Sequence, residues 1–407
     1  RHGWLGRVRH FLVLGAVHVV IGLHIAHWLT SGTTVTPVEP SEAMAFSRDS
    51  IINAGLIFFA AMIGLTAIFG RFFCGWGCHL VALQDLCRHW LMKIGITPQP
   101  LRSRWLAWVP TLAFAYMFLW PAAFRLWTGD SLAVRGLELT TSAFWATFPG
   151  WIVGGLTLLT CGFACVYFLG AKGFCTYACP YGAVFAAADR LAPLRIRVSD
   201  ACEQCGHCTA VCSSNIRVHE EVRDWGMVMS PGCMKCMDCV SVCPKDALSY
   251  SAGPIPLLAH RRTELRPTSA PPLRGRDEAL LVVVFAATFF CVRGIYGVVP
   301  FLLALGLAGI SAFLALTALR LARQPTLSRP GLRLKQGGQW LPGGRVFLLA
   351  GALWLTLLLH CALIVGHDLL GAQAYERLLA TRVTFLNTPD SEHALEARQQ
   401  ADAQRAT

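Results

Sequence analysis

The chain has 407 residues, of which 55% are hydrophobic and only 14% are charged. Soluble domains average about 25% charged residues, so this composition excludes a protein that is exposed to water throughout. The formal net charge of +12 fits either a nucleic-acid binder or a membrane protein with basic loops. The high apolar content favours the membrane protein, because basic loops beside apolar spans mark the cytoplasmic side of a bilayer.

Seven apolar stretches approach the length of about 20 residues that a helix needs to cross a bilayer. They are Phe11–Leu29, Ile51–Phe73, Trp105–Trp127, Ala143–Leu169, Ala279–Val292, Val298–Leu319 and Val346–Val365. The Arg293-Gly294 break divides the fifth stretch from the sixth. We interpret these two as a hairpin of two spans, with one long tilted helix as the alternative.

Basic residues gather in alternate loops. Arginine and lysine are frequent before the first span, between the second and third, from Lys172 to Arg276, and before the last span. In contrast, the Ser31–Ser50 loop carries three acidic residues against Arg48 alone. The positive-inside rule then predicts a cytoplasmic N-terminus, a cytoplasmic cysteine-rich section, and a tail from Asp368 to Thr407 on the far side.

Eight of the 17 cysteines form two regular runs. Three thiolates of such a run bind one [4Fe–4S] cluster, and the fourth binds the cluster of the other run, as in bacterial two-cluster ferredoxins. This spacing predicts one cluster on Cys202, Cys205, Cys208 and Cys243, and a second on Cys233, Cys236, Cys239 and Cys212. Four-cysteine zinc sites are the alternative. The interleaving of the two runs argues against zinc. Ser213 stands where a proline usually follows the first run.

The ends of the second and fourth predicted spans resemble each other. Residues 71–79 align with residues 172–180 in a basic residue, a phenylalanine, an aromatic residue and two cysteines. This indicates two copies of one hairpin, which would place Cys74, Cys78, Cys175 and Cys179 at the cytoplasmic membrane border. Residues four apart share a helix face, and thiolates suit copper(I) and iron–sulfur chemistry. An additional metal or redox site on these four cysteines is one interpretation, and inert packing of buried thiols is the other.

Two membrane-border Cys-x3-Cys motifs followed by a two-cluster ferredoxin segment resemble the NapH/NosR/CcoG group of membrane polyferredoxins. The resemblance covers roughly residues 1–250, and His79 departs from it by replacing the proline that usually follows the first motif. It implies a protein of the bacterial inner membrane that relays electrons between the quinol pool, or a cytoplasmic donor, and an extracytoplasmic c-type cytochrome or metalloreductase. Assembly of a metalloenzyme, with reduction of copper by the Cys-x3-Cys motifs, is the alternative that the resemblance implies.

Histidines within predicted spans are candidates for function, because ionisable groups are costly at membrane depth. His18 and His360 lie near the predicted mid-plane, and His24, His27 and His367 lie toward the far side. Three interpretations stay open: axial ligands of a b-type haem, a quinone pocket, and hydrogen-bonded contacts between helices.

The predicted fold class is mainly α, a polytopic bundle of about seven transmembrane helices with an inserted α+β ferredoxin-like segment. The predicted role is that of an electron-transfer subunit of an oxidoreductase, with quinol oxidation as one option. The predicted regions are a four-span region (1–195), the ferredoxin-like segment (196–252), a basic, proline-rich linker (253–278), the C-terminal spans (279–367) and a polar tail (368–407).

Overall fold

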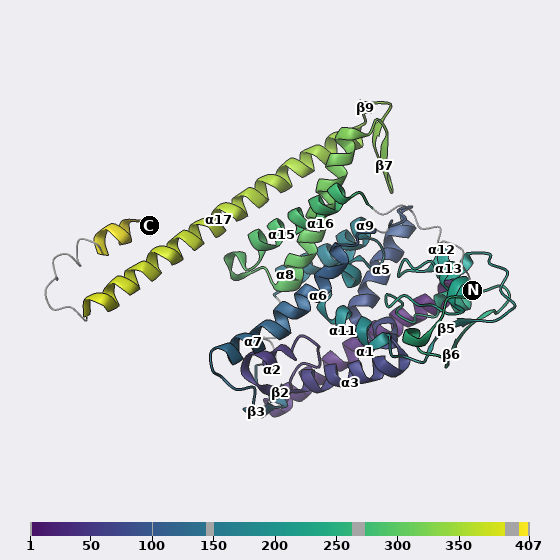
Figure 1. Cartoon of the computed structure of the whole chain (residues 1–407), viewed down its shortest axis with the longest axis horizontal. Coiled ribbons are helices and arrows are strands. Elements are labelled where there is room, and N and C mark those ends of the chain that lie inside the picture. The colour runs from purple at the N-terminus through teal and green to yellow at the C-terminus, as the bar shows by residue number, and fades with distance from the viewer. Residues whose placement is uncertain (1, 100, 144–149, 263–272, 387–398, 406–407) are drawn as a thin grey trace.

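The computed structural model describes residues 2–99, 101–143, 150–262, 273–386 and 399–405 (Figure 1). Parts of the predicted fourth span, the linker and the tail lie outside these residues. Four long helical segments form the N-terminal half. They are α1 (His2–Ser31), α3 (Ala54–Phe69), Leu106–Trp127 and Trp151–Leu169. The third consists of a 3-10 turn (Leu106–Trp108), α6 (Val109–Phe114), a π-helical turn (Ala115–Leu119) and α7 (Trp120–Trp127). The fourth consists of α8 (Trp151–Thr157), a π-helical turn (Leu158–Ala164) and α9 (Cys165–Leu169).

Short helices follow two of these segments in the same order. After α3 come α4 (Phe72–Trp76) and α5 (His79–Lys93), and after α9 come α10 (Gly173–Tyr177) and α11 (Pro180–Asp189). The long helices stop at Gly70 and Gly170, whose positive φ angles of 64° and 103° are open to glycine but rare for other residues. The chain therefore turns sharply at the same place in both repeats.

Short strands close the opposite end of this half. β1 (Thr34–Val35) pairs antiparallel with β4 (Thr140–Thr141), and β2 (Ile51–Asn53) pairs parallel with β3 (Gly136–Glu138), beside α2 (Met44–Asp49). Asn53 caps α3 by accepting a hydrogen bond from the Leu56 backbone N–H at 2.8 Å. The predicted second span is thus a strand followed by a helix that begins at Ala54, not a helix from Ile51.

A small α+β unit follows α11. β5 (Arg195–Val198) pairs antiparallel with β6 (Leu248–Ser251), with Arg195 opposite Ser251 and Val198 opposite Leu248. Between these strands lie α12 (His207–Val211), α13 (Val218–Trp225) and α14 (Asp238–Ser241). Its core is a cluster of aliphatic side chains around the cysteines, namely Ile196, Ile216, Val218, Val222, Val228 and Leu248. We call residues 196–252 the ferredoxin-like segment.

The C-terminal half begins with a helical hairpin. α15 (Gly275–Val292) and α16 (Phe301–Arg323) are joined by a turn at Gly294, with φ of 72°, and a 3-10 turn (Ile295–Gly297). An ion pair joins Asp277 to Arg320 at one end, and the Phe289 and Phe301 rings meet at the other. The two helices are therefore antiparallel, which agrees with the predicted hairpin and excludes one long helix.

A three-stranded sheet and one very long helix follow α16. The sheet is β7 (Leu327–Arg329), β8 (Leu332–Gln336) and β9 (Gln339–Trp340), and the helix is α17 (Pro342–Leu386). α17 contacts α16 through a hydrogen bond from Trp354 Nε1 to Ser311 Oγ at 2.8 Å. It then projects away from the other helices (Figure 1) and continues without a break through the predicted boundary at residue 367.

Within the residues that the structure describes, five helices are long and apolar enough to cross a membrane. They are Phe11–Ser31, Leu106–Trp127, Trp151–Leu169, Phe301–Arg323 and Pro342–Leu379. α3 is apolar but has only 16 residues, or about 24 Å of helix against a hydrocarbon core of about 30 Å. α15 has acidic residues in its first turn. The predicted count of seven spans therefore stays a prediction.

The long helices nevertheless alternate in direction. The start of α1 and the end of α3 lie at the ferredoxin-like segment, where Arg9 donates to the Cys236 carbonyl and Tyr250 donates to the Phe69 carbonyl. At the opposite end, Trp28 donates to the Ser142 carbonyl. Figure 1 shows the same arrangement, with β5, β6, α12 and α13 at one end of the bundle and β2, β3 and α2 at the other. The ferredoxin-like segment thus lies at a single end of the helical bundle.

Candidate iron–sulfur sites and their attachment to the helices

Two hollows in the ferredoxin-like segment are each lined by four cysteines. The outer hollow, of about 400 Å³ including its open mouth, is lined by Cys202, Cys205, Cys208 and Cys243. The inner hollow, of about 340 Å³, is lined by Cys212, Cys233, Cys236 and Cys239. In each hollow, three cysteines come from one run and the fourth comes from the other run. The structure thus brings together the four cysteines of each predicted ligand set.

The backbone around the two hollows repeats the same unusual conformations. Left-handed φ angles occur just before the second cysteine of each run, just after it, and three residues after the fourth cysteine. The matched pairs are Gln204 and Lys235, Gly206 and Met237, and Asn215 and Asp246. A left-handed residue other than glycine costs about 1–2 kcal/mol. Such alternation turns successive N–H groups toward one concave anion site, which suits the negative charge of a thiolate-bound cluster.

The donor sets fit [4Fe–4S] clusters, which are held by four cysteine thiolates and supply one-electron redox chemistry when bound. The Ala247 N–H lies 3.2 Å from Cys243 Sγ, a backbone donor of the kind that stabilises a ligating thiolate. Among the described residues, no three His, Cys, Asp or Glu side chains are placed to hold a single metal ion.

Burial controls the protonation of the inner thiols. It raises the pKa of Cys212 to about 12, and together with the Asp238 carboxylate it raises the pKa of Cys236 to about 12. These thiols are therefore protonated at neutral pH when no metal is bound. Metal binding at the inner hollow must release protons, because only the thiolate is a ligand.

The inner hollow rests directly on the first Cys-x3-Cys repeat. Trp76 Nε1 donates to the Lys235 carbonyl at 2.9 Å, and the Arg71 guanidinium donates to the Pro231 carbonyl at 3.0 Å. Arg9 of α1 donates to the Cys236 carbonyl at 2.9 Å and pairs with Asp85 of α5 at the same distance. The loop that carries Cys233 and Cys236 is thereby fixed to three helices of the bundle.

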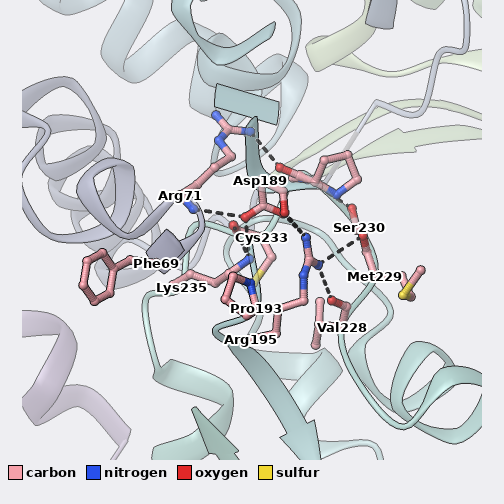
Figure 2. A network of polar contacts seen from close by, with 12 residues as sticks. Phe69, Arg71, Asp189, Pro193, Arg195, Val228, Met229, Ser230, Cys233 and Lys235 are labelled. Carbon is pink, nitrogen blue, oxygen red and sulfur yellow. Dashed lines mark hydrogen bonds and ion pairs between the residues drawn. The ribbon is translucent and has the colours of Figure 1, made fainter. Parts of the chain in front are cut away.

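A fully buried charge network joins the same parts (Figure 2). The Asp189 carboxylate, at the end of α11, binds Arg195 of β5 and pairs with Lys235 Nζ at 2.8 Å. All three side chains are 0% exposed. Asp189 also accepts the Arg71 backbone N–H at 3.0 Å. One carboxylate therefore holds together a helix of the bundle, a strand of the ferredoxin-like segment and the inner cysteine loop.

Gly75 shows how closely these parts approach. A Cβ at this position would collide with the Met234 carbonyl oxygen and lie 3.4 Å from the Cys236 nitrogen. We expect Gly75→Ala to weaken the seating of the cysteine loop by about 1–3 kcal/mol, the usual cost of overpacking. The result should be faster proteolysis within residues 196–252 and a lower iron content. Gly64→Ala, where a Cβ has nothing within 4 Å, is the matched control; equal loss in both variants would contradict the close approach.

The four cysteines of the two Cys-x3-Cys motifs, predicted to lie at the membrane border, occupy equivalent places in the two repeats. Cys74 and Cys175 lie in the short helices α4 and α10, and Cys78 and Cys179 precede the first residues of α5 and α11. The spacing predicts that the members of each pair share one helix face. In the structure they do not, because a helix ends between them. All four pack into one cluster of side chains, which also contains Met234. The structure thus brings the two motifs together from residues about 100 positions apart.

Three histidines of the predicted spans, His18, His24 and His360, have local partners. His18 Nδ1 lies 2.6 Å from the Leu14 carbonyl, and His24 Nδ1 lies 3.3 Å from Thr34 Oγ1. His360 Nε2 lies 2.9 Å from the Tyr296 hydroxyl. These contacts suit hydrogen bonds within and between helices. Haem and quinone binding by the histidines therefore stay predictions.

The polar groups of the attachment are not recognisable in the sequence. Asp189, Arg195 and Arg71 belong to no metal-ligand motif. The available signals were an acidic residue at the end of an alanine-rich stretch and a lysine between Cys233 and Cys236. Such lone charges usually lie in solvent, so only the folded arrangement reveals their role.

Comparison with known proteins finds iron–sulfur families in three segments of the chain. The family described as a 4Fe-4S binding domain matches residues 53–95 and 151–199, which contain the two Cys-x3-Cys repeats. The family described as a 4Fe-4S dicluster domain matches residues 201–248. No solved structure matches the chain significantly. The chain is thus similar to ferredoxin-type proteins with 4Fe–4S binding domains.

Its relatives include two ferredoxin-type proteins and a putative electron transport protein. The chain is 27% identical to the ferredoxin-type protein NapH of Haemophilus influenzae over 210 residues, or 50% of this chain and 68% of that protein. It is 25% identical to the putative electron transport protein YccM of Escherichia coli, over 48% of this chain and 55% of that one. It is also 25% identical to the methylamine utilization ferredoxin-type protein MauN of Methylorubrum extorquens, over 52% of this chain and 75% of that protein. The predicted resemblance to NapH-type membrane polyferredoxins is confirmed.

Proposed function

We propose that the protein relays single electrons through two [4Fe–4S] clusters at one face of a membrane. The observation that carries this proposal is the pair of hollows, each lined by four cysteines drawn from both runs. Cys202, Cys205, Cys208 and Cys243 would hold the outer cluster, and Cys212, Cys233, Cys236 and Cys239 the inner one. A structural role would need only one such site, whereas two adjacent sites suit a relay.

The two hollows differ in their surroundings in a way that gives the relay two ends. Cys205 of the outer hollow is exposed, so a soluble protein can approach the outer ligand set directly. Cys239 of the inner hollow is buried, and the inner loop contacts the helical bundle through Lys235 and Cys236. Electrons would enter or leave in solution at one end and at the membrane at the other. The protein's own contribution is to fix these positions and to exclude water from the inner set.

The partners follow from this placement and from the family. We propose seven spans in the bacterial inner membrane, with the ferredoxin-like segment on the cytoplasmic face, where the basic loops lie. The donor is the quinol pool or a reduced cytoplasmic protein, and the acceptor is an extracytoplasmic c-type cytochrome or metalloreductase. NapH and MauN, by their names, are ferredoxin-type proteins, the second of them in methylamine utilization.

Anaerobic purification tests this function. We expect at least about eight iron atoms per chain, the content of two [4Fe–4S] clusters, and visible absorbance that bleaches on reduction. A short-chain quinol added to the protein in vesicles should bleach it if the quinol pool is the donor, and a reduced soluble ferredoxin should do so if the donor is cytoplasmic. Zinc in place of iron, or iron that neither donor reduces, would refute the relay.

A second function has one observation in its favour. The four membrane-border thiols gather in one place, as a site that reduces or delivers copper during metalloenzyme assembly would require. This candidate predicts copper bound by these thiols and a target enzyme that lacks its metal when they are replaced. The metal analysis described below distinguishes the two functions.

A further inference from the structure

The four membrane-border cysteines form a single group. Cys74 and Cys175 are buried, Cys78 and Cys179 are partly buried, and all belong to one packed cluster. Each of the six possible pairs among them lies within electrostatic range. The group is built symmetrically, with one thiol in a short helix and one at the start of the next helix from each repeat. Four converging thiols are the ligand number of iron–sulfur clusters and of soft metal ions.

A buried cation next to this group has no carboxylate partner. Arg71 is 5% exposed, and its guanidinium faces Cys74, with Cys175 and Cys179 also within electrostatic range. Within the described part of the chain, no acidic side chain lies at ion-pair distance from this guanidinium, and its Nε lacks a hydrogen-bond partner. Arginine does not lose its proton in proteins, and an unpaired buried charge costs several kcal/mol. The negative charge that balances Arg71 must therefore come from the thiols.

The neighbouring carboxylates are already paired with other cations, so they do not supply that charge. Lys172 and Arg9 both pair with Asp85, and Arg9 also lies 3.5 Å from Asp238. Asp189 is shared by Arg195 and Lys235. The corresponding lysine of the second repeat is thus neutralised by a carboxylate, whereas the arginine of the first repeat is not.

One further buried polar atom borders the same group without a partner. Gln84 donates from Nε2 to Cys175 Sγ at 2.9 Å, and its Oε1 is unsatisfied. The Gln84 side chain is more than nine-tenths buried. Buried polar atoms without partners are rare in native proteins. Two of them, Arg71 Nε and Gln84 Oε1, lie beside one group of thiols and indicate an occupant.

We propose that Cys74, Cys78, Cys175 and Cys179 hold a third iron–sulfur cluster, which would join the ferredoxin-like segment to the interior of the helical bundle. Met234, between Cys233 and Cys236, packs in the same side-chain cluster as Cys74 and Cys175, and Gly75 admits its carbonyl. This inference rests on the proposed relay. A redox-active cluster at this point would extend the electron path from the inner hollow, whereas a zinc ion cannot carry electrons. Four thiolates around a cluster give the negative charge that Arg71 requires.

Iron analysis of the wild-type protein in its holo form is the first test. We expect about ten to twelve iron atoms per chain, which is the eight of the ferredoxin-like segment plus two or four. Cys78→Ala/Cys179→Ala, which removes one thiol from each repeat, should lose these two or four atoms and one paramagnetic signal while retaining the ferredoxin signals. Cys87→Ala is the matched control, because Cys87 is a buried cysteine of α5 that packs against Gly162, outside this group.

The outcomes separate this inference from the proposed relay. A wild-type content of eight iron atoms, unchanged in Cys78→Ala/Cys179→Ala, would overturn the third cluster and leave the relay intact. Copper or zinc lost from the double variant in place of iron would also overturn it. Absence of iron from the ferredoxin-like segment would refute the relay itself. If the double variant does not fold, Arg71→Gln serves instead: the loss of the adjacent positive charge should lower the midpoint potential of one signal, and three unchanged potentials would count against the site.

Discussion

Replacing Cys243 by alanine should abolish the same paramagnetic signal as replacing Cys208, although Cys243 belongs to the other cysteine run. Cys243 lines the outer hollow together with Cys202, Cys205 and Cys208, so its loss leaves that set with three thiolates. Each variant should lose up to about four iron atoms per chain. Cys212→Ala should behave like Cys239→Ala, because both line the inner hollow. Alanine is preferred to serine, whose hydroxyl can itself bind iron.

Spectroscopy of anaerobic, reduced protein decides the grouping. The four single variants should fall into two classes, Cys208 with Cys243 and Cys212 with Cys239, each retaining the signal that the other class loses. Cys87→Ala, outside both hollows, serves again as control and should retain every signal. If Cys243→Ala instead matches Cys239→Ala, each run holds its own cluster, and the crossed assignment is wrong.

The grouping of the cysteines around the two hollows was predictable because it depends on local spacing. Three cysteines separated by two residues each wrap one site almost regardless of the rest of the fold. The short β5–β6 pairing also brings Cys243, just before β6, close to the run that begins at Cys202, just after β5. The apolar stretches likewise predicted the long helices, since length and hydropathy alone govern them. The hairpin also followed from a local signal, the Arg293-Gly294 break between two apolar stretches. In the structure Gly294 makes the turn with a φ of 72°.

Contacts between distant segments could not be read in the same way. The convergence of Cys74 and Cys175 depends on how two repeats about 100 residues apart pack, which no spacing encodes. Asp189 and Arg195 look like ordinary surface charges in the sequence, yet neither is exposed. The shortness of α3 depends on the pairing of β2 with β3, which turns the first residues of a predicted span into a strand. Each of these features arises from tertiary packing that overrides the local pattern.

Asp189→Asn should detach the ferredoxin-like segment from the helical bundle more effectively than any other single replacement of a charged residue. The change leaves Arg195 and Lys235, both 0% exposed, without their shared carboxylate. Removing one partner of a buried ion pair typically costs about 3–5 kcal/mol, because the remaining charge is neither solvated nor paired. Lys235 lies between Cys233 and Cys236, so its displacement should also disturb the inner hollow. We expect faster amide hydrogen exchange through β5 and faster loss of iron to a chelator.

Two comparisons show whether charge, and not shape alone, causes this effect. In Asp189→Asn/Lys235→Met, one of the two unpaired cations is gone, so part of the lost stability should return, as a double-mutant cycle can measure. In Glu203→Gln, the broken pair with Lys245 is 62% and 52% exposed, and exposed pairs contribute only about 0–1 kcal/mol. If Asp189→Asn costs no more than Glu203→Gln, the buried network does not hold the segment in place. The inner cysteines would then owe their position to the hydrogen bonds from Trp76, Arg71 and Arg9.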